Sequence, residues 1–323
     1  GAMVTMPIFT GGQIYHGNQL AKLGVELSEL QLRQTRNEVT LTVDQYYWNI
    51  VVLNEKLKTL QHVSALLEKI CSDAKAAVDA GIKNRNDLLQ VELRKNETQS
   101  VVIDIQNNIA ICKMLLAQYI GTDMNGFDVQ TAVSNELSSP EQLYVNHNER
   151  LETTVEYQLL NKAVDASKLE KRLNTGQFLP MIALQGGYLY NDFMGPSQNS
   201  FVGMLNVSIP ISWKAPFSVR KYKLRHQNAV TEFNNGSEQL MIRMQKAQID
   251  LNNAYQQALI ARNSIEQSEE NLRLNEQYYK AGTSSMSDLL QAQQLYQQSC
   301  DKYAEAYSKY EISKTEYLQA TGR

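Results

Sequence analysis

The chain contains the same ten-residue motif twice, 201 positions apart. AGIKNRNDLL begins at Ala80, and AGTSSMSDLL begins at Ala281. When the chain is shifted against itself by 201 residues, ten of the 42 ungapped positions from 80 to 121 are identical. Six of these identities fall in the first eleven positions, so the motif is the most similar part of the two copies. A repeat of this size indicates a duplicated supersecondary unit.

Each motif follows a long polar tract in which apolar or small residues recur every seven positions. The first tract has this period at Ile50, Leu57, Ser64, Cys71 and Val78, interleaved with Leu53, Leu60, Leu67 and Ala74. The second tract has it at Leu251, Ala258, Ile265, Leu272 and Tyr279, interleaved with Ala254, Ala261, Ser268 and Asn275. No proline interrupts residues 13–80 or 217–280. This spacing predicts long helices that supercoil around their neighbours.

The motif itself has the residues of a turn between two helices. Gly81 and Gly282 stand where a helix C-cap glycine is favoured. The expected N-terminal caps are Asn84 with Asp87 in the first copy and Ser285 with Asp288 in the second, each pair arranged as a capping box. Each unit is therefore predicted to be a long helix, a tight turn and an antiparallel return helix. The turns span 80–87 and 281–288, and the return helices span 84–120 and 285–321.

Helix lengths suggest how the units are completed. A helix over 13–80 would span about 100 Å, one over 84–120 about 55 Å, and one over 151–175 about 37 Å. The two shorter helices together nearly match the long one. The second unit has a long helix over 217–281 but no remaining segment to extend its return helix. We therefore expect a helix and a strand upstream of residue 1, and the opening Gly-Ala-Met is typical of a cloning remnant on a truncated chain.

Two segments alternate in hydropathy and predict a β-hairpin. In residues 181–192 the apolar positions that share a face are Ile182, Leu184, Tyr188 and Tyr190. In residues 201–212 they are Phe201, Leu205, Val207, Ile209 and Ile211. A Gly/Pro/Ser loop over 193–200 joins them. About ten residues a side is enough to cross a bilayer as a tilted strand, although a half-buried hairpin of a soluble domain has the same pattern. Residues 3–9 are expected to be the end of another strand.

Composition excludes several classes of protein. The net charge is −3, which gives no general field for nucleic acid. No apolar run approaches 18 residues, so no transmembrane helix is expected, and no signal peptide is expected within this sequence. The three cysteines lack CxxC spacing, and the four histidines have no metal-ligand spacing. No catalytic motif occurs, so we expect no enzyme activity, no cofactor and no metal.

These features together resemble the TolC-like outer-membrane efflux protein family (outer membrane factors). The resemblance rests on PIFTGG and SIPIS before the long helices, on FLPMIALQGGY at 178–188, on the paired AG-x5-DLL turns and on the twofold repeat. It covers nearly the whole chain. It implies a mainly α protein with long antiparallel coiled-coil hairpins and a short β-hairpin. The expected division is a first repeat over 1–121, an equatorial segment with a short helix over 122–177, and a second repeat over 178–323.

The family implies an outer-membrane channel of a tripartite efflux or type I secretion system. It would be a homotrimer with a 12-stranded β-barrel in the outer membrane and an α-helical barrel in the periplasm. Its partners would be a periplasmic adaptor, an inner-membrane pump and outer-membrane lipid. Drugs or small toxic compounds would pass through it as a passive exit duct, and the pump and adaptor would supply the energy for transport.

The resemblance also assigns roles to particular residues. The tips that meet the adaptor would include Ala80, Gly81, Ile82, Ala281, Gly282 and Thr283. The constriction would include Asp288, Gln291 and Tyr279. The family commonly has a second carboxylate where this chain has Gln291, so a charged ring at that place would be halved or formed elsewhere. Simple helix capping by Asp87 and Asp288, and simple seam packing by Tyr279, remain alternatives.

A basic cluster follows the second strand and has two readings. Trp213, Arg220, Lys221 and Lys223 would lie at lipid head-group level if the strands enter a membrane. Otherwise they form a solvated face. Two other functions also remain open, a soluble coiled-coil scaffold and a periplasmic adaptor-like protein. The strand-Pro-helix junction, which occurs twice, argues against the scaffold, and the small number of strands argues against the adaptor.

Overall fold

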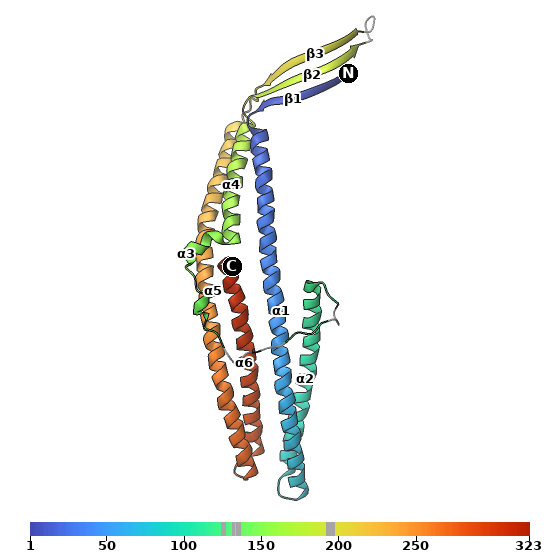
Figure 1. Cartoon of the computed structure of the whole chain (residues 1–323), viewed down its shortest axis with the longest axis vertical. Helices are drawn as coiled ribbons and strands as arrows, with labels where there is room; N and C mark the ends of the chain where they lie inside the picture. Colours follow the sequence, from blue (N-terminus) through green and yellow to red (C-terminus); the bar gives the residue numbers. More distant parts are fainter. Residues whose placement is uncertain (124–126, 131–132, 134–136, 192–197) are drawn as a thin grey trace. The chain divides into compact units, whose positions relative to one another are not determined.

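In the computed structural model, the chain is described over residues 1–323 except 124–126, 131–132, 134–136 and 192–197 (Figure 1). The strands and long helices, in chain order, are β1 (Ala2–Thr10), α1 (Gln13–Asp79), α2 (Arg85–Ile120), α4 (Val155–Gly176), β2 (Met181–Asn191), β3 (Gln198–Ser208), α5 (Ala215–Lys280) and α6 (Met286–Ala320). Three short helical turns lie between α2 and α4: η1 (Pro140–Leu143), α3 (His147–Arg150) and η2 (Leu151–Thr153). The predicted mainly α fold with a small antiparallel sheet is confirmed.

Two compact units divide the chain, and α1 and α5 contribute to both. The first unit contains residues 1–35, 148–242 and 322. The second contains residues 36–147, 243–321 and 323. This division by packing differs from a division by sequence repeat, because each long helix passes from one unit into the other.

The sheet of the first unit has three antiparallel strands in the order β1-β2-β3. The β2–β3 register pairs Leu184 with Leu205 and Tyr188 with Phe201, while β1 pairs with the other edge of β2. The apolar positions predicted for the hairpin therefore lie opposite each other on one face. This face is exposed, and the Phe201 side chain is 90% accessible. A soluble domain would cover such a face, because contiguous exposed apolar surface favours association or membrane contact.

Two prolines shape one end of this sheet, where Thr10, Met181 and Ser208 pair across the three strands. The register of β1 against β2 shifts between Pro7 and Phe9, at a residue that has no N–H for the ladder. The predicted second strand, which extended to residue 212, ends at Ser208. Pro210 explains this correction, since it cannot donate to a ladder. The predicted loop over 193–200 lies partly outside the described residues, and β3 already begins at Gln198.

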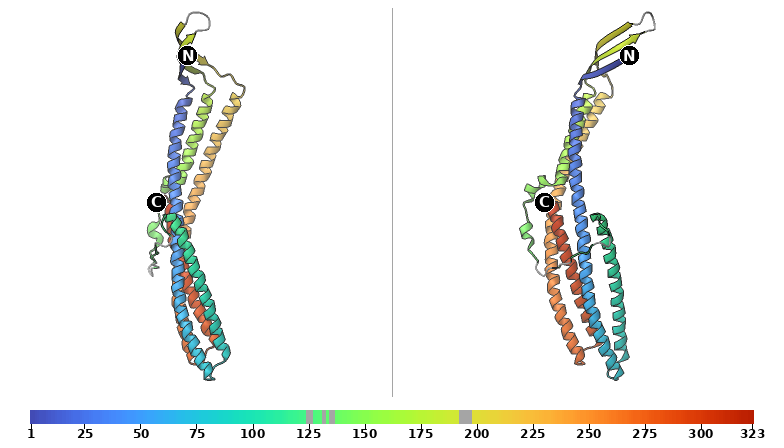
Figure 2. Two further views of the ribbon diagram at one scale, coloured as in Figure 1. Left: turned by 90° about the vertical axis from the view of Figure 1, so that its right-hand side faces the viewer. Right: turned by 45° about the vertical axis from the view of Figure 1, so that its right-hand side comes forward.

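Three helical segments pack below the sheet in the first unit: the start of α1, all of α4 and the start of α5 (Figure 2). A Cβ added to Gly11 would lie 2.1 Å from the carbonyl oxygen of Gly176, so these two backbones are in direct contact. Gly236 allows a similar approach of α5 to Leu160 of α4. The ammonium of Lys162 on α4 binds the carboxylate of Glu26 on α1 at 2.5 Å. The expected helix over 151–175 begins later than predicted, because Thr154 is an extended N-cap whose hydroxyl accepts from the Tyr157 N–H.

The second unit contains two helical hairpins, α1 with α2 and α5 with α6. The positions of the seven-residue period are buried or half-buried in both long helices within this unit. The fully buried ones include Ile50, Leu60 and Leu67 on α1 and Leu251 and Ala258 on α5. The coiled-coil seam predicted from the sequence is therefore the packed face of these helices.

Within the second unit, tyrosines of α6 bind the backbone of the equatorial segment at Ser138 and Val145. The Tyr310 hydroxyl donates to the carbonyl of Ser138 at 2.6 Å. The Tyr317 hydroxyl accepts from the backbone N–H of Val145 at 3.2 Å, and the Arg323 guanidinium lies over the Tyr317 ring. Both tyrosines are buried, so each polar tip has the partner that its burial requires.

Candidate functional site: the paired helical tips

The two repeated motifs form turns with the same backbone geometry. Gly81 has a φ of +72°, and Gly282 has a φ of +75°. Each glycine N–H donates to the carbonyl three residues earlier, at 2.9 Å for Gly81 and 3.0 Å for Gly282. The next N–H, of Ile82 or Thr283, reaches back five residues at 2.9 Å in both turns. This is the left-handed helix end that glycine favours, so the predicted C-cap role of both glycines is correct.

The starts of the two return helices differ. Ser285 forms the predicted capping box: its hydroxyl accepts from the Asp288 N–H at 3.2 Å, and the Asp288 carboxylate accepts from the Ser285 N–H at 3.0 Å. Asn84 occupies the N-cap position with an extended backbone, but its side chain makes no capping bond. The predicted capping box of Asn84 and Asp87 is therefore wrong. There the Asp87 N–H bonds to the backbone carbonyl of Asn84 at 3.1 Å, so the donor is satisfied without a side chain.

Hydrogen bonds stabilise the charged form of Asp288. The Ser284 and Ser285 hydroxyls donate to its Oδ2 at 3.2 Å and 2.6 Å. Bonds from the Ser285 side chain, the Ser285 backbone and Ser284 lower the pKa of Asp288 below its ordinary value. The carboxylate is exposed, so it presents a fixed negative charge at this tip.

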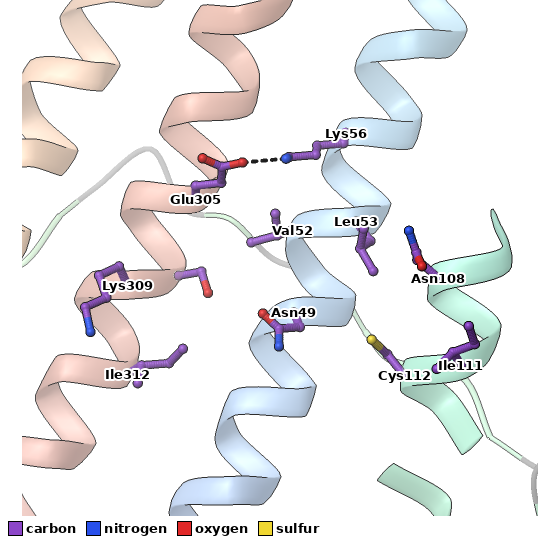
Figure 3. Close-up of a pocket in the computed structure, with 11 residues that line it drawn as sticks. Asn49, Val52, Leu53, Lys56, Asn108, Ile111, Cys112, Glu305, Lys309 and Ile312 are labelled. Atoms are coloured by element: carbon purple, nitrogen blue, oxygen red, sulfur yellow. Dashed lines mark hydrogen bonds and ion pairs between the residues drawn. The ribbon is translucent and has the colours of Figure 1, made fainter. Parts of the chain in front are cut away.

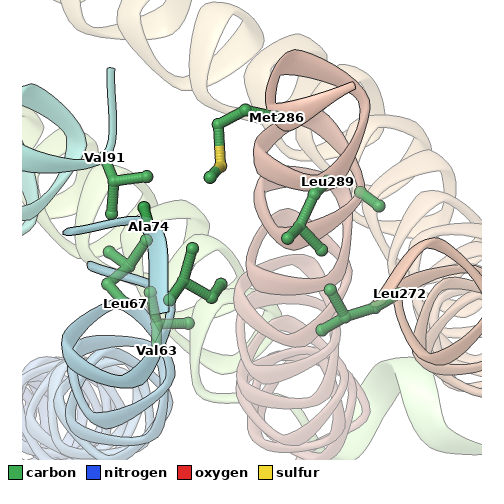
Figure 4. Close-up of a cluster of buried hydrophobic side chains, with 9 residues drawn as sticks. Val63, Leu67, Ala74, Val91, Leu272, Met286 and Leu289 are labelled. Atoms are coloured by element: carbon green, nitrogen blue, oxygen red, sulfur yellow. The ribbon is translucent and has the colours of Figure 1, made fainter. Parts of the chain in front are cut away.

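An apolar cluster joins the two hairpins behind the turns (Figure 4). Its buried members come from all four helices: Val63, Leu67, Ile70 and Ala74 on α1, Val91 on α2, Leu272 on α5, and Met286, Leu289 and Ala292 on α6. The contribution of α6 is larger than that of α2. Met286 is 1% exposed, whereas the position 201 residues earlier is the exposed Arg85.

A cavity of about 340 Å³ opens beside this cluster. Its apolar lining is Leu66, Ile70, Ala77, Ile82 and Leu289, and its polar lining is Lys69, Asp73, Lys83, Glu276, Tyr279 and Lys280. The Lys83 ammonium lies 4.7 Å from the centre of the Tyr279 ring. Burial, followed by the charges of Asp87 and Asp73, raises the pKa of Tyr279. The structure thus brings Tyr279 close to residues of the first turn, which the sequence alone did not predict.

Polar residues fill the contact between α2 and α6 on another side of the tips. Gln293 is fully buried, and its Oε1 accepts from the Arg94 guanidinium at 3.2 Å. Gln291, predicted for the constriction, lines a shallow cavity next to this pair together with Arg94 and Glu97. Gln291 therefore lies among charged side chains of α2, although it carries no charge itself.

A second large cavity, of about 480 Å³, lies farther from the tips between α1, α2 and α6 (Figure 3). Its floor is apolar, with Val52, Leu53 and Ile111. An ion pair between Lys56 on α1 and Glu305 on α6, at 2.5 Å, crosses its edge. Near that pair, one buried carboxylate oxygen of Asp301, Oδ1, has no hydrogen-bond partner among the residues that the structure describes. Among the described residues, no three His, Cys, Asp or Glu side chains lie close enough to hold a metal ion.

The predicted membrane-interface residues lie in the first unit at the start of α5. Trp213 is 94% exposed just before the helix. Arg220, Lys221 and Lys223 are exposed on its first turns. These residues follow the exposed apolar sheet along the chain, as the prediction required, and their contact with lipid remains a prediction.

Helix α2 is more apolar than expected from the sequence, which predicted no helix that could cross a membrane. Within the described residues it is the one helix long and apolar enough to cross a membrane, judged by length and composition. Most of its apolar stretch is exposed rather than buried. The expectation of no such segment overlooked it because polar residues such as Asp104 and Asn107 interrupt the apolar run. The exposed large residues of this region are Val101, Ile103, Ile111, Met114, Leu115, Tyr119 and Ile120.

Comparisons with known proteins agree with this geometry. The sequence profile of the outer membrane efflux protein family matches residues 1–122. No curated protein matches the chain by sequence. Among solved structures, the outer membrane protein VceC from Vibrio cholerae superposes with a TM-score of 0.84 at 13% identity, over 99% of this chain and 78% of that one.

Two further structures superpose with slightly higher TM-scores. CusC gives a TM-score of 0.88 at 14% identity, over 99% of this chain and 76% of the other. The CmeC outer membrane channel of Campylobacter jejuni gives 0.88 at 16% identity, over 99% and 70%. The chain thus has the fold of the outer-membrane channel proteins. The recognition made from the sequence, the TolC-like outer-membrane efflux protein family, is confirmed, with the family match over residues 1–122.

Proposed function

We propose that the chain is the outer-membrane channel component of a tripartite efflux or type I secretion system, a passive exit duct for drugs or small toxic compounds. The observation that carries this proposal is the exposed apolar face of the β1-β2-β3 sheet, which continues directly into helices of an efflux-channel fold. A soluble coiled-coil scaffold would leave that face without cover. The matched family is one of membrane channels rather than of enzymes.

The proposed assembly is a homotrimer whose strands form one barrel in the outer membrane. Three strands with unpaired edges cannot stand alone in lipid, because their N–H and C=O groups would have no partners there. The exposed apolar residues of α2 also call for a partner surface. Residues such as Ile103 and Met114 would pack against a neighbouring protomer in the helical part, which lies in the periplasm.

The proposed roles of the tips follow from their shape. Both turns end their hairpins with an exposed glycine, and Ile82 beside Gly81 is 74% exposed. We assign adaptor contact to Ala80, Gly81, Ile82, Ala281, Gly282 and Thr283. An inner-membrane pump would act through that adaptor. Asp288 would give one carboxylate per protomer at a constriction, with Gln291 and Tyr279 beside it.

Export by the full-length protein tests this function. Gly282→Pro should reduce efflux of a toxic compound while the protein still reaches the outer membrane. Proline cannot adopt a φ of +75° and removes the N–H that bonds to Tyr279. The control is Gly24→Ala in α1, a glycine substitution away from the tips where an added Cβ meets nothing within 4 Å. Export that is unchanged after proline replaces both Gly81 and Gly282 would contradict the proposed role of the tips.

A single-channel measurement tests the constriction separately. Asp288→Asn should weaken block of the current by divalent cations, because each protomer would lose its fixed charge. Gln291→Asn, which changes no charge, is the control. Block that is identical in wild type and Asp288→Asn would leave Asp288 with its capping role alone.

A further inference from the structure

The cavity beside the apolar cluster of the tips has features of a ligand site for an amphipathic molecule. It lies between α1 and α5, and Leu289 of α6 closes one side. Ile70 and Leu289 on its wall are buried, so an apolar group placed there would join the core of the tips. Its volume of about 340 Å³ is at the lower end of the range for small-molecule sites.

The charged side chains that line the cavity include one more cation than anions. Lys69 and Asp73 are four residues apart on α1, and Glu276 and Lys280 are four apart on α5, so each acid has a lysine on its own helix face. Lys83 comes from the turn and has no such neighbour in the lining. Among the described residues, none of the three lysines in the lining forms an ion pair within 4.0 Å. Lys83 differs from the other two because its ammonium lies 4.7 Å from the centre of the Tyr279 ring.

Lys83 is also held in place rather than free in solvent. Its side chain is half-buried, and its backbone N–H bonds to the carbonyl of Ala77 at 3.2 Å. Asp87 acts on Tyr279 by its charge but does not line the cavity. A fixed ammonium at the edge of an apolar wall favours a ligand with one negative head and an apolar tail.

We propose that this cavity binds a single-chain amphipathic carboxylate, with its tail on the apolar wall and its head group at the Lys83 ammonium. Such a ligand touches the first turn, α1, α5 and α6 at once, and therefore joins the two hairpins of one chain. The proposal depends on a cavity within one chain and not on the channel function proposed above.

Photolabelling of the purified full-length protein in lipid nanodiscs tests the site. The probe is a ten-carbon carboxylate with a diazirine near the end of its tail, and labelled positions are read by peptide mass spectrometry. Labels are expected on the lining segments 66–77 and 276–289. Lys83→Gln should reduce this labelling roughly tenfold, since a charge-assisted bond is lost.

Three controls separate the site from general attraction. Lys75→Gln removes the same charge from an exposed lysine of α1 that does not line the cavity, and should reduce labelling less than about twofold. Ala77→Trp should abolish labelling by filling the wall. The matching ten-carbon alcohol should label the segments weakly. Circular dichroism confirms that each variant keeps its helices.

Several results would overturn the proposal. Equal labelling by the alcohol would show a purely apolar groove, and equal losses with Lys83→Gln and Lys75→Gln would show attraction by net charge. Labels confined to the sheet would show partition into the bilayer. If Lys83→Gln failed to fold, Ala77→Trp and the alcohol would still decide the question.

Discussion

The two tips have the same turn but are attached to the molecule in different ways. Both glycines have the same φ and the same pair of backbone bonds. The tip of α6 then adds a capping box and buries Met286 and Leu289. The tip of α2 has no side-chain cap, and its equivalent positions, Arg85 and Leu88, are exposed and half-buried.

This difference shows what each part of the repeated motif determines. Ala-Gly ends the first helix of each hairpin, and that function depends only on backbone conformation. The residues after it decide how firmly the return helix is fixed to its neighbours. The α6 tip is fixed by buried side chains and hydrogen bonds, whereas the α2 tip depends mainly on its backbone bonds. We expect the α2 tip to open more readily.

The largest difference should come from the paired leucines of the motif. Leu289→Ala should lower the free energy of local unfolding by about 3 kcal/mol, because it leaves a cavity in the cluster. Leu88→Ala at the equivalent position should cost about 1 kcal/mol, since this side chain is only partly buried. Hydrogen exchange of the tip amides measures both values. Equal losses would contradict the unequal attachment of the two tips.

The glycines should behave alike, in contrast to the leucines. Gly81→Ala and Gly282→Ala should each cost about 1–2 kcal/mol, because a Cβ disfavours the left-handed conformation. No atom lies within 4 Å of an added Cβ at either site, so the cost is conformational in both. Exchange of the turn amides is again the measurement. A difference of more than about 1 kcal/mol between the two would show that the turns are not equivalent.

The sequence predicted those parts of the molecule that depend on local chemistry. The glycine caps, the seven-residue seam and the apolar face of the sheet follow from spacing and conformational preference, and the structure has all three. The second strand was predicted to reach residue 212 because its apolar residues continue to alternate. The strand ends at Ser208, before Pro210, which has no N–H to donate.

The parts that sequence could not predict depend on tertiary packing. Asn84 is a common capping residue, yet the backbone at that turn satisfies the Asp87 N–H by itself. The approach of Lys83 to Tyr279 joins residues nearly 200 positions apart, and no local pattern indicates it. Whether Asp288, Gln291 and Tyr279 face a channel depends on neighbouring chains, which one sequence does not describe.

A smaller effect should distinguish the two return helices by pH. Asp301 on α6 is partly buried, and burial raises its pKa to about 6, against the opposing charge of Lys56. Glu305 on the same helix raises it further. The equivalent residue of α2 is the exposed Ser100. Between pH 6 and the unfolded value near 3.8, the folded state binds a proton that the unfolded state does not.

Stability of the α6 hairpin should therefore rise by on the order of 1 kcal/mol as the pH falls from 7.5 to 4.5. Asp301→Asn should remove most of this dependence, and Ser100→Asp, which adds an exposed carboxylate, should not create one on α2. Thermal unfolding and hydrogen exchange across this pH range measure the change. An unaltered pH profile in Asp301→Asn would show that other groups cause it.

The smallest expected difference concerns the caps. Ser285→Ala removes a hydroxyl that both caps the Asp288 N–H and donates to the Asp288 carboxylate, so it should cost about 1 kcal/mol at the start of α6. Asn84→Ala removes a side chain that makes no capping bond and should change the α2 tip by less than about 0.5 kcal/mol. The same serine substitution has a second consequence, because the Ser285 hydroxyl is the largest cause of the lowered pKa of Asp288. That pKa should move back toward its ordinary value in Ser285→Ala, and titration of the carboxylate by NMR measures the shift. Stability that falls equally in both variants would show that Asn84 caps its helix in solution, and the comparison of the tips would then rest on the leucines alone.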